Sequence, residues 1–97
     1  MAVLAMMDIK VKPESLEGLK AFLREELGHT RAYDGCQGLT VHSNLVDPNN
    51  LVFVGSWESK DHYDKYLAWR QERGDLAKLG AMLAADPDMR QFEIVGV

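Results

Sequence analysis

Apolar and polar residues alternate over residues 3–12, which is typical of a β-strand with one buried face. One face of this predicted strand is wholly apolar: Val3, Ala5, Met7, Ile9 and Val11. The other face is mixed: Leu4, Met6, Asp8, Lys10 and Lys12. After Pro13 the apolar spacing becomes helical, at Leu16, Leu19, Phe22, Leu23 and Leu27. Because proline suits a first helical turn, we predict a helix over about residues 14–32.

The middle of the chain carries the signals of an antiparallel hairpin. Gly35 and Gly38 follow the predicted helix, and residues 39–46 alternate as a second strand. Asp47-Pro48-Asn49-Asn50 suits a tight turn, so residues 51–59 are predicted to return as a third strand. Both faces of this third strand are apolar, with Val52 and Val54 opposite Leu51, Phe53 and Trp57.

A second helix is predicted after the third strand, with Ser59 or Asp61 as its N-cap. One stripe of this helix holds Tyr63, Tyr66, Leu67 and Arg70. The helix is predicted to break near Gly74, restart at Asp75 and continue until Asp86-Pro87. Residues 90–97 then alternate as a last strand, with Phe92 and Ile94 opposite Glu93 and Val95.

The order βαββαβ predicts an α+β fold of the ferredoxin-like type, a four-stranded antiparallel sheet in a single domain over residues 1–97. Two helical segments cover only one side of such a sheet, yet the third strand is apolar on both sides. We therefore expect a homodimer, a dimeric α+β barrel in which the uncovered faces meet. The side chains expected at this contact are Leu4, Met6, Val52 and Val54.

Charge and composition limit the classes of partner and compartment. A net charge of −4, without a run of lysines or arginines, argues against nucleic-acid binding. The apolar opening of the chain lacks the features of a secretory signal, and no stretch is apolar enough to span a membrane, so we expect no membrane partner and a cytoplasmic location. The single cysteine, Cys36, is interpreted as a structural thiol rather than a nucleophile.

Aromatic residues are the main candidates for chemistry. In this fold a pocket is expected between the helices and the inner face of the sheet. Trp57 is predicted to stack on an aromatic ring or stabilise a radical, and Tyr63 to donate a hydrogen bond to a phenol or quinone oxygen. Phe53, Tyr66 and Arg70 are predicted to bind the substrate. Tyr66 and Arg70 lie one helical turn apart. The alternative is that Trp57 and Tyr63 are core residues and that the Tyr66–Arg70 pair is a rim interaction reaching solvent.

Histidines are spread along the chain without the spacing of a metal motif. They are His29, His42 and His62, and we expect no metal site. His42 is the best candidate for proton transfer, although it is equally compatible with a place in the dimer contact. Asn44, on the same face of the predicted strand, is a candidate for substrate binding with the same alternative.

The sequence contains none of the usual signatures of a bound cofactor, and we expect no cofactor. Oxygenation would then require a substrate that reacts with O2 itself, such as an electron-rich dihydroxyaromatic anion. The protein would desolvate the substrate, orient it and assist its deprotonation.

Three segments carry a resemblance to a known family: residues 30–36, the turn Asp47-Pro48-Asn49-Asn50, and the strand of residues 51–59. The order of these segments resembles that of the antibiotic biosynthesis monooxygenase family, which consists of small dimeric α+β proteins. The resemblance extends from residue 8 to residues 92–95 near the end of the chain. The resemblance implies cofactor-free oxidation of a quinol-type aromatic. Many family members that look like quinol oxidants carry a histidine at the place of Tyr66 and an acidic residue at that of Gly55, so the chain departs from them there.

The leading hypothesis is a cofactor-independent monooxygenase that oxidises a small phenolic or quinol-type aromatic with O2. A second hypothesis is a non-catalytic binding or stress-response protein that uses the same pocket. Haem degradation is a third: haem-degrading relatives share Trp57, but they also use an asparagine on the first strand and a later helical histidine, both of which this chain lacks.

Overall fold

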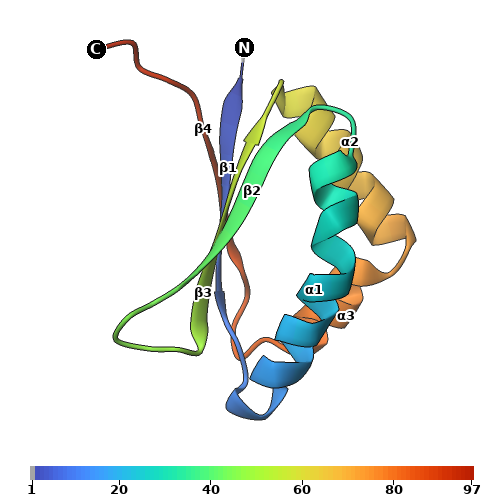
Figure 1. Ribbon diagram of the computed structural model, residues 1–97, viewed down its shortest axis with the longest axis vertical. Helices are drawn as coiled ribbons and strands as arrows, with labels where there is room; N and C mark the ends of the chain where they lie inside the picture. The colour runs from blue at the N-terminus through green and yellow to red at the C-terminus, as the bar shows by residue number, and fades with distance from the viewer. Residues whose placement is uncertain (1) are drawn as a thin grey trace.

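The computed structural model describes residues 2–97 and shows one sheet with three helices on one side (Figure 1). The strands are β1 (Val3–Lys10), β2 (Cys36–Ser43), β3 (Asn50–Trp57) and β4 (Asp88–Phe92). The helices are α1 (Leu16–Ala32), α2 (Lys60–Glu72) and α3 (Asp75–Ala81), and a 3-10 turn, Pro13–Ser15, precedes α1.

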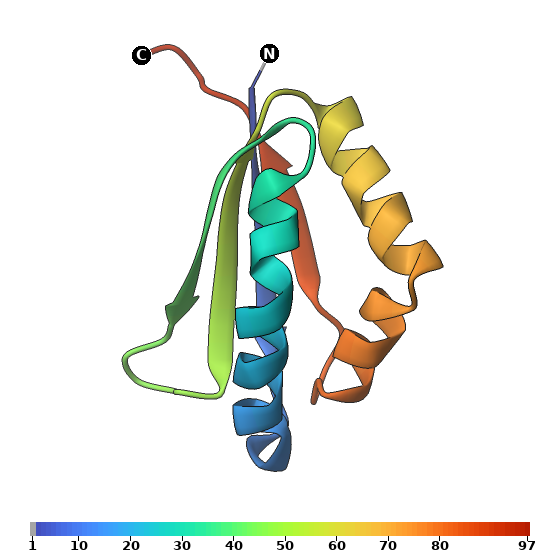
Figure 2. The same ribbon diagram turned by 45° about the vertical axis from the view of Figure 1, so that its right-hand side comes forward.

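The strands are antiparallel and lie in the order β2-β3-β1-β4. Two β-α-β units therefore interleave, which is the ferredoxin-like α+β topology predicted from the sequence. Helix α1 runs along the sheet, with α2 and α3 beside it on the same face (Figure 2). The sheet consequently has one face covered by helices and one bare face.

The covered face holds the core, in two clusters that meet along β1 and β3. The larger cluster is centred on Ile9, Val11, Leu19, Leu51, Phe53, Leu79 and Leu83, and the smaller on Ala5, Trp57 and Tyr63. The period-two pattern of β1 and β3 places the strand residues of both clusters on the side of the sheet that the helices cover. Trp57, only 1% exposed, anchors the end of the core that lies against α2.

Local signals set most of the boundaries. Ser59 is the N-cap of α2, because its Oγ accepts a hydrogen bond from the backbone N–H of His62 at 3.2 Å. Gly74 separates α2 from α3 with φ of +79°, a conformation that glycine adopts without strain. The helical break predicted at this glycine is thus confirmed.

Three predicted boundaries were wrong. The second strand is Cys36–Ser43 rather than 39–46, because its pairing with β3 begins at Cys36 and ends at Ser43, after which the side-chain oxygen of Asn44 accepts from the backbone N–H of Val46 and starts the turn.

The last strand is Asp88–Phe92 rather than 90–97. Phe92 pairs with Leu4, and because β1 begins at Val3, residues 93–97 run past its start and form no ladder with it. Helix α3 ends at Ala81 rather than near Asp86, because Leu83 forms a β-bridge with Val11. Tertiary pairing overrides the helical pattern there.

The bare face of the sheet carries an apolar centre. The strand registers place Leu4, Met6, Val52, Val54 and Phe92 there, and all five are half-buried or exposed. The β2–β3 turn and the residues after β4 both extend toward this side of the sheet (Figure 1). Their apolar side chains, Leu45, Val46, Ile94 and Val95, are among the most exposed in the chain.

None of the helices in residues 2–97 has both the length and the apolar character needed to span a membrane.

The turn between α1 and β2 makes a testable prediction about Gly35. This residue has φ of +88°, and a Cβ added to it would lie 2.5 Å from the His62 side chain. Gly35→Ala is therefore expected to lower the free energy of unfolding by more than about 1 kcal/mol. Gly28→Ala, at an exposed position of α1 with open space around it, is the matched control and should raise stability by roughly 0.5–1 kcal/mol. Urea unfolding curves measure both, and equal effects of the two variants would contradict the prediction.

Candidate functional site

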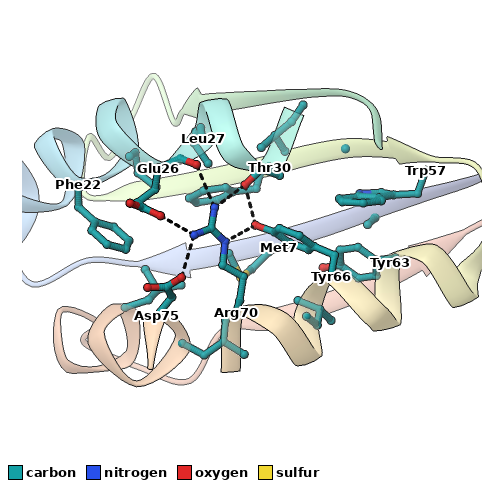
Figure 3. Close-up of a pocket in the computed structure, with 18 residues that line it drawn as sticks. Met7, Phe22, Glu26, Leu27, Thr30, Trp57, Tyr63, Tyr66, Arg70 and Asp75 are labelled. Atoms are coloured by element: carbon teal, nitrogen blue, oxygen red, sulfur yellow. Dashed lines mark hydrogen bonds and ion pairs between the residues drawn. The ribbon is translucent and has the colours of Figure 1, made fainter. Parts of the chain in front are cut away.

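A cavity of about 90 Å³ lies between the helices and the covered face of the sheet (Figure 3). Most of its wall is apolar and comes from all the layers of the fold, with Met7, Phe22, Leu23, Leu27, Leu39, Phe53, Leu67, Leu76 and Leu79. An apolar cavity of about 150 Å³ holds benzene in another protein. A one-ring ligand therefore fits only if adaptable lining side chains, such as Met7, shift outward.

One end of the cavity is aromatic. The ring centroids of Trp57 and Tyr66 lie 4.9 Å apart, and those of Trp57 and Tyr63 lie 5.4 Å apart. All three side chains line the cavity. Behind them, outside the cavity lining, Tyr33 packs against Tyr66 at 5.4 Å and Trp69 at 5.2 Å. These tilted and edge-on contacts fix the orientation of the aromatic wall.

The other end is a buried charge network centred on Arg70, which is 4% exposed. Its Nη1 donates to Glu26 Oε1 on α1 at 2.7 Å and to Asp75 Oδ2 at the start of α3 at 2.8 Å. Its Nη2 donates to the Glu26 carbonyl and to Thr30 Oγ1, each at 2.9 Å. Its Nε donates to the Tyr66 hydroxyl at 2.9 Å. These five bonds use all five N–H donors of the guanidinium group.

The network is balanced in charge. Arg73 also approaches both carboxylates, at 3.3 Å from Glu26 and 3.4 Å from Asp75, so two guanidinium groups face two carboxylates. Burial alone would lower the pKa of Arg70, but hydrogen bonds to Asp75, Tyr66 and Glu26 outweigh it and raise that pKa. The hydrogen bond from Arg70 lowers the pKa of Glu26, against the opposing effect of burial. Both partners are therefore held in their charged forms.

Tyr63 has the opposite environment. Burial, with a smaller contribution from Tyr66, raises the pKa of Tyr63 to about 12. Its phenol therefore stays protonated at physiological pH and is available to donate a hydrogen bond.

Gly55 shapes the floor beneath the indole of Trp57. A Cβ at this position would lie 3.1 Å from Trp57 Nε1 and 3.3 Å from Leu39 Cδ1. Even the smallest side chain would crowd the indole, so the acidic residue of the quinol-oxidant pattern has no room here without movement of Trp57.

The structure brings most of the predicted site residues together. Phe53, Trp57, Tyr63, Tyr66 and Arg70 all line the one cavity, from β3 and α2. The alternative of a solvent-exposed Tyr66–Arg70 rim pair is wrong, because Arg70 is almost fully buried. Arg70 nevertheless keeps no free donor for a ligand.

His42 and Asn44 do not join this group. His42 lies on the bare face of the sheet, opposite Val52, with its Nε2 2.8 Å from Thr40 Oγ1. Asn44 belongs to the β2–β3 turn. Its side-chain Nδ2 donates to Asn50 Oδ1 at 2.9 Å, and its side-chain Oδ1 accepts from the backbone N–H of Val46 at 2.8 Å. Since neither residue lines the cavity, neither enters the function proposed below.

Sequence reasoning missed three polar residues of the network: Glu26, Thr30 and Asp75. Glu26 and Thr30 lie one turn apart on α1, a spacing that places them on one side of the helix among its apolar positions. That spacing was an available signal, although the partner, Arg70, is more than 35 residues away along the chain.

Cys36 is half-buried and packs against the cluster of Trp57 and Tyr63. Within residues 2–97 no group of three or more histidine, cysteine, aspartate or glutamate side chains is arranged to hold a metal ion.

Comparison with known proteins identifies the family of this chain from its sequence. The sequence model for antibiotic biosynthesis monooxygenase matches residues 2–73. The chain belongs to the antibiotic biosynthesis monooxygenase family. No curated protein matches the sequence.

Several solved structures share the fold of this family member at low sequence identity. A conserved protein from Methanosarcina mazei Go1 superposes with a TM-score of 0.88 and 17% identity, over 96% of this chain and 92% of that one. A protein from Mycobacterium tuberculosis gives a TM-score of 0.88 and 18% identity, over 100% and 98% of the two chains. The crystal structure of an antibiotic biosynthesis monooxygenase gives 0.87 and 19%, over 96% and 98%. At these identities the likeness concerns the fold.

The lowered pKa of Glu26 predicts an acid-dependent loss of stability. In the folded state this pKa lies below the ordinary value of 4.5, so ionised Glu26 stabilises the fold above that pH, and its contribution is lost as the pH falls through the folded value. Glu26→Gln should be less stable than the native chain at pH 7, and the difference should shrink below about pH 4. Urea unfolding across this pH range is the measurement. Glu25→Gln, at an exposed neighbouring position, is the control, and a difference for Glu26→Gln that does not change with pH would contradict the assignment.

Proposed function

We propose that this protein is a cofactor-independent monooxygenase that oxidises a small phenolic or quinol-type aromatic with O2. The observation that carries the proposal is the aromatic wall of the cavity, in which Trp57, Tyr63 and Tyr66 converge. Membership of the antibiotic biosynthesis monooxygenase family supports the reaction class. The cavity volume of about 90 Å³ favours a single ring over a polycyclic substrate.

The proposed chemistry relies on the substrate as the reductant of O2. With 1,4-hydroquinone, one oxygen atom replaces a ring hydrogen to give hydroxybenzoquinone, and the second oxygen leaves as water with the two hydrogens removed. The indole of Trp57 stacks on the ring, and the protonated Tyr63 phenol donates a hydrogen bond to a substrate oxygen. The dry, apolar wall strengthens such a bond, because little water competes for it.

Haem degradation receives no support from the site. A porphyrin is several times larger than the cavity of about 90 Å³, and no histidine lines that cavity among residues 2–97. The competing function is ligand binding without turnover, which an apolar cavity of this size also allows.

We also propose that the protein acts as a homodimer through the bare face of the sheet. Leu4, Met6, Val52 and Val54 form its apolar centre, and the exposed Leu45 and Ile94 belong to segments that extend toward the same side (Figure 1). Burying each large side chain against a second copy would contribute roughly 1.5–3 kcal/mol. This surface lies opposite the helices, so a second copy would leave each cavity intact.

Oxygen uptake tests the reaction. The native chain is expected to consume O2 with 1,4-hydroquinone or methylhydroquinone and to release the hydroxylated quinone. Tyr63→Phe should lower kcat/KM roughly 10²-fold, because it removes a donor aimed at developing charge in a dry site. Tyr33→Phe removes a hydroxyl outside the cavity and serves as the control, with no change expected. Thermal-shift binding without O2 uptake would instead establish the non-catalytic function. A chain that shows no binding and no O2 uptake would refute both functions.

Sedimentation tests the dimer. The native chain should sediment as two copies at micromolar concentration, and Val54→Lys, which places a charge in the apolar centre, should weaken association more than about 10-fold. Ala21→Lys, on the exposed side of α1, should leave it unchanged. A native chain that sediments as one copy would overturn this part of the proposal.

A further inference from the structure

Every tyrosine and tryptophan of the chain belongs to one aromatic cluster. The chain contains three tyrosines and two tryptophans, and each ring contacts at least two of the others, with centroids 4.9–6.5 Å apart. The members are Tyr33, Trp57, Tyr63, Tyr66 and Trp69. Rings whose centroids lie about 4.5–7 Å apart are in contact. Because tyrosine and tryptophan are the aromatic side chains that most readily give up an electron, the cluster is a continuous set of oxidisable groups.

The aromatic cluster has an inner end in the cavity and an outer end at the surface. Trp57, 1% exposed, lines the cavity, whereas Tyr33 is half-buried and lies outside the lining. The two rings are 6.5 Å apart, and Tyr66 bridges them, at 4.9 Å from Trp57 and 5.4 Å from Tyr33. Electron tunnelling weakens steeply with distance, so ring-to-ring contact favours rapid transfer by both routes.

Proton transfer selects Tyr33 as the member from which an electron is finally lost. A tyrosine that loses an electron also loses its phenol proton, so it needs an acceptor for that proton. The Tyr33 hydroxyl lies at an exposed position, 3.5 Å from the Lys65 carbonyl, where water can take the proton. Tyr63 lacks this outlet, because burial raises its pKa to about 12 and so holds the proton in place.

Positive charge opposes oxidation of the two rings beside Tyr33. The guanidinium groups of Arg70 and Arg73 lie over the Trp69 ring, each with its Cζ 4.8 Å from the ring centroid. Arg70 also donates to the Tyr66 hydroxyl at 2.9 Å. Cations this close make the loss of an electron from a ring less favourable. Tyr66 is therefore suited to relay an electron, and Trp69 does not compete with Tyr33 as its source.

We propose that the aromatic cluster carries an electron from Tyr33 to Trp57 when a radical forms in the cavity, and thereby protects the cavity from oxidation. The inference rests on the proposed function, because reduction of O2 by the substrate is the source of such radicals.

The proposed steps balance in electrons and protons. A hydroperoxyl radical that escapes the substrate takes one electron from Trp57 and one proton from water, giving hydrogen peroxide. The Trp57 radical cation takes an electron from Tyr33, and the phenol proton of Tyr33 passes to water. A soluble thiol then returns a hydrogen atom to the Tyr33 radical, and two of the resulting thiyl radicals combine to a disulfide.

Laser photoionisation of the indole tests this path without substrate or O2. The experiment uses Trp69→Phe, in which Trp57 is the one tryptophan left, and light that indole absorbs but phenol does not. A scavenger consumes the ejected electron. The absorption of the Trp57 radical should decay in a first-order phase that does not depend on protein concentration, and the absorption of a phenoxyl radical should rise at the same rate.

Three further variants in this background identify the electron donor. Tyr33→Phe should lose most of the phenoxyl signal and prolong the Trp57 radical, because phenylalanine keeps the ring but is not oxidised. Tyr63→Phe is the matched control: its phenol is nearer to Trp57, at 5.4 Å rather than 6.5 Å, yet its removal should leave both signals unchanged. Cys36→Ser, which removes a thiol packed against the same rings, should also leave them unchanged.

Protection is measured by mass spectrometry after repeated pulses in air with a soluble thiol present. Tyr33→Phe should accumulate oxidised Trp57 faster than the Trp69→Phe parent, because the Trp57 radical is no longer repaired. Equal accumulation in the two proteins would overturn the protective role.

The path itself would be overturned by a phenoxyl signal that survives in Tyr33→Phe, by its loss in Tyr63→Phe or Cys36→Ser, or by a Trp57 radical that decays with no phenoxyl rise. Because the photoionisation measurement involves neither substrate nor O2, these failures are distinguishable from a failure of the oxygenase reaction. Electron transfer from Tyr33 in a protein that takes up no O2 would uphold the path and refute only the turnover.

Discussion

The buried guanidinium group of Arg70 is the constraint on which the rest of the site depends. A charge removed from water needs partners for all its donors, and these come from α1 and α3 as well as from α2 itself. Three helices are thereby held at one fixed spacing over the sheet. The gap that remains between this network and the aromatic wall is the cavity. Its size and shape thus follow from the need to satisfy one side chain.

The two faces of the sheet have different roles because the strands alternate. Odd-numbered positions of β1 and β3 pack under the helices, and the even-numbered Leu4, Met6, Val52 and Val54 form the apolar centre of the bare face. A single register therefore separates ligand chemistry from the proposed dimer contact. His42 illustrates the separation: it follows Val41, which faces the core, and so it lies on the other side.

The sequence predicted the fold and the aromatic part of the site, since both depend on local periodicity. Alternation located the strands, the Asp-Pro-Asn-Asn turn joined two of them, and the spacing of Tyr63, Tyr66 and Arg70 put them on one stripe. The charge network was not predictable in this way, because Glu26 and Arg70 meet only after the helices pack. The end of β4 was mispredicted for a similar reason: Ile94 and Val95 continue the pattern, but no strand remains beside them.

The exact balance of charge beside the cavity has a consequence for how the site responds to its medium. With Arg70 and Arg73 matched by Glu26 and Asp75, the group projects little net field into the ligand space. Dissolved ions screen long-range attraction, but they have little effect on short hydrogen bonds against an apolar wall. We therefore expect ligand affinity at this site to depend little on ionic strength, whereas a pocket built around an unmatched arginine would bind charged ligands less tightly as salt is added.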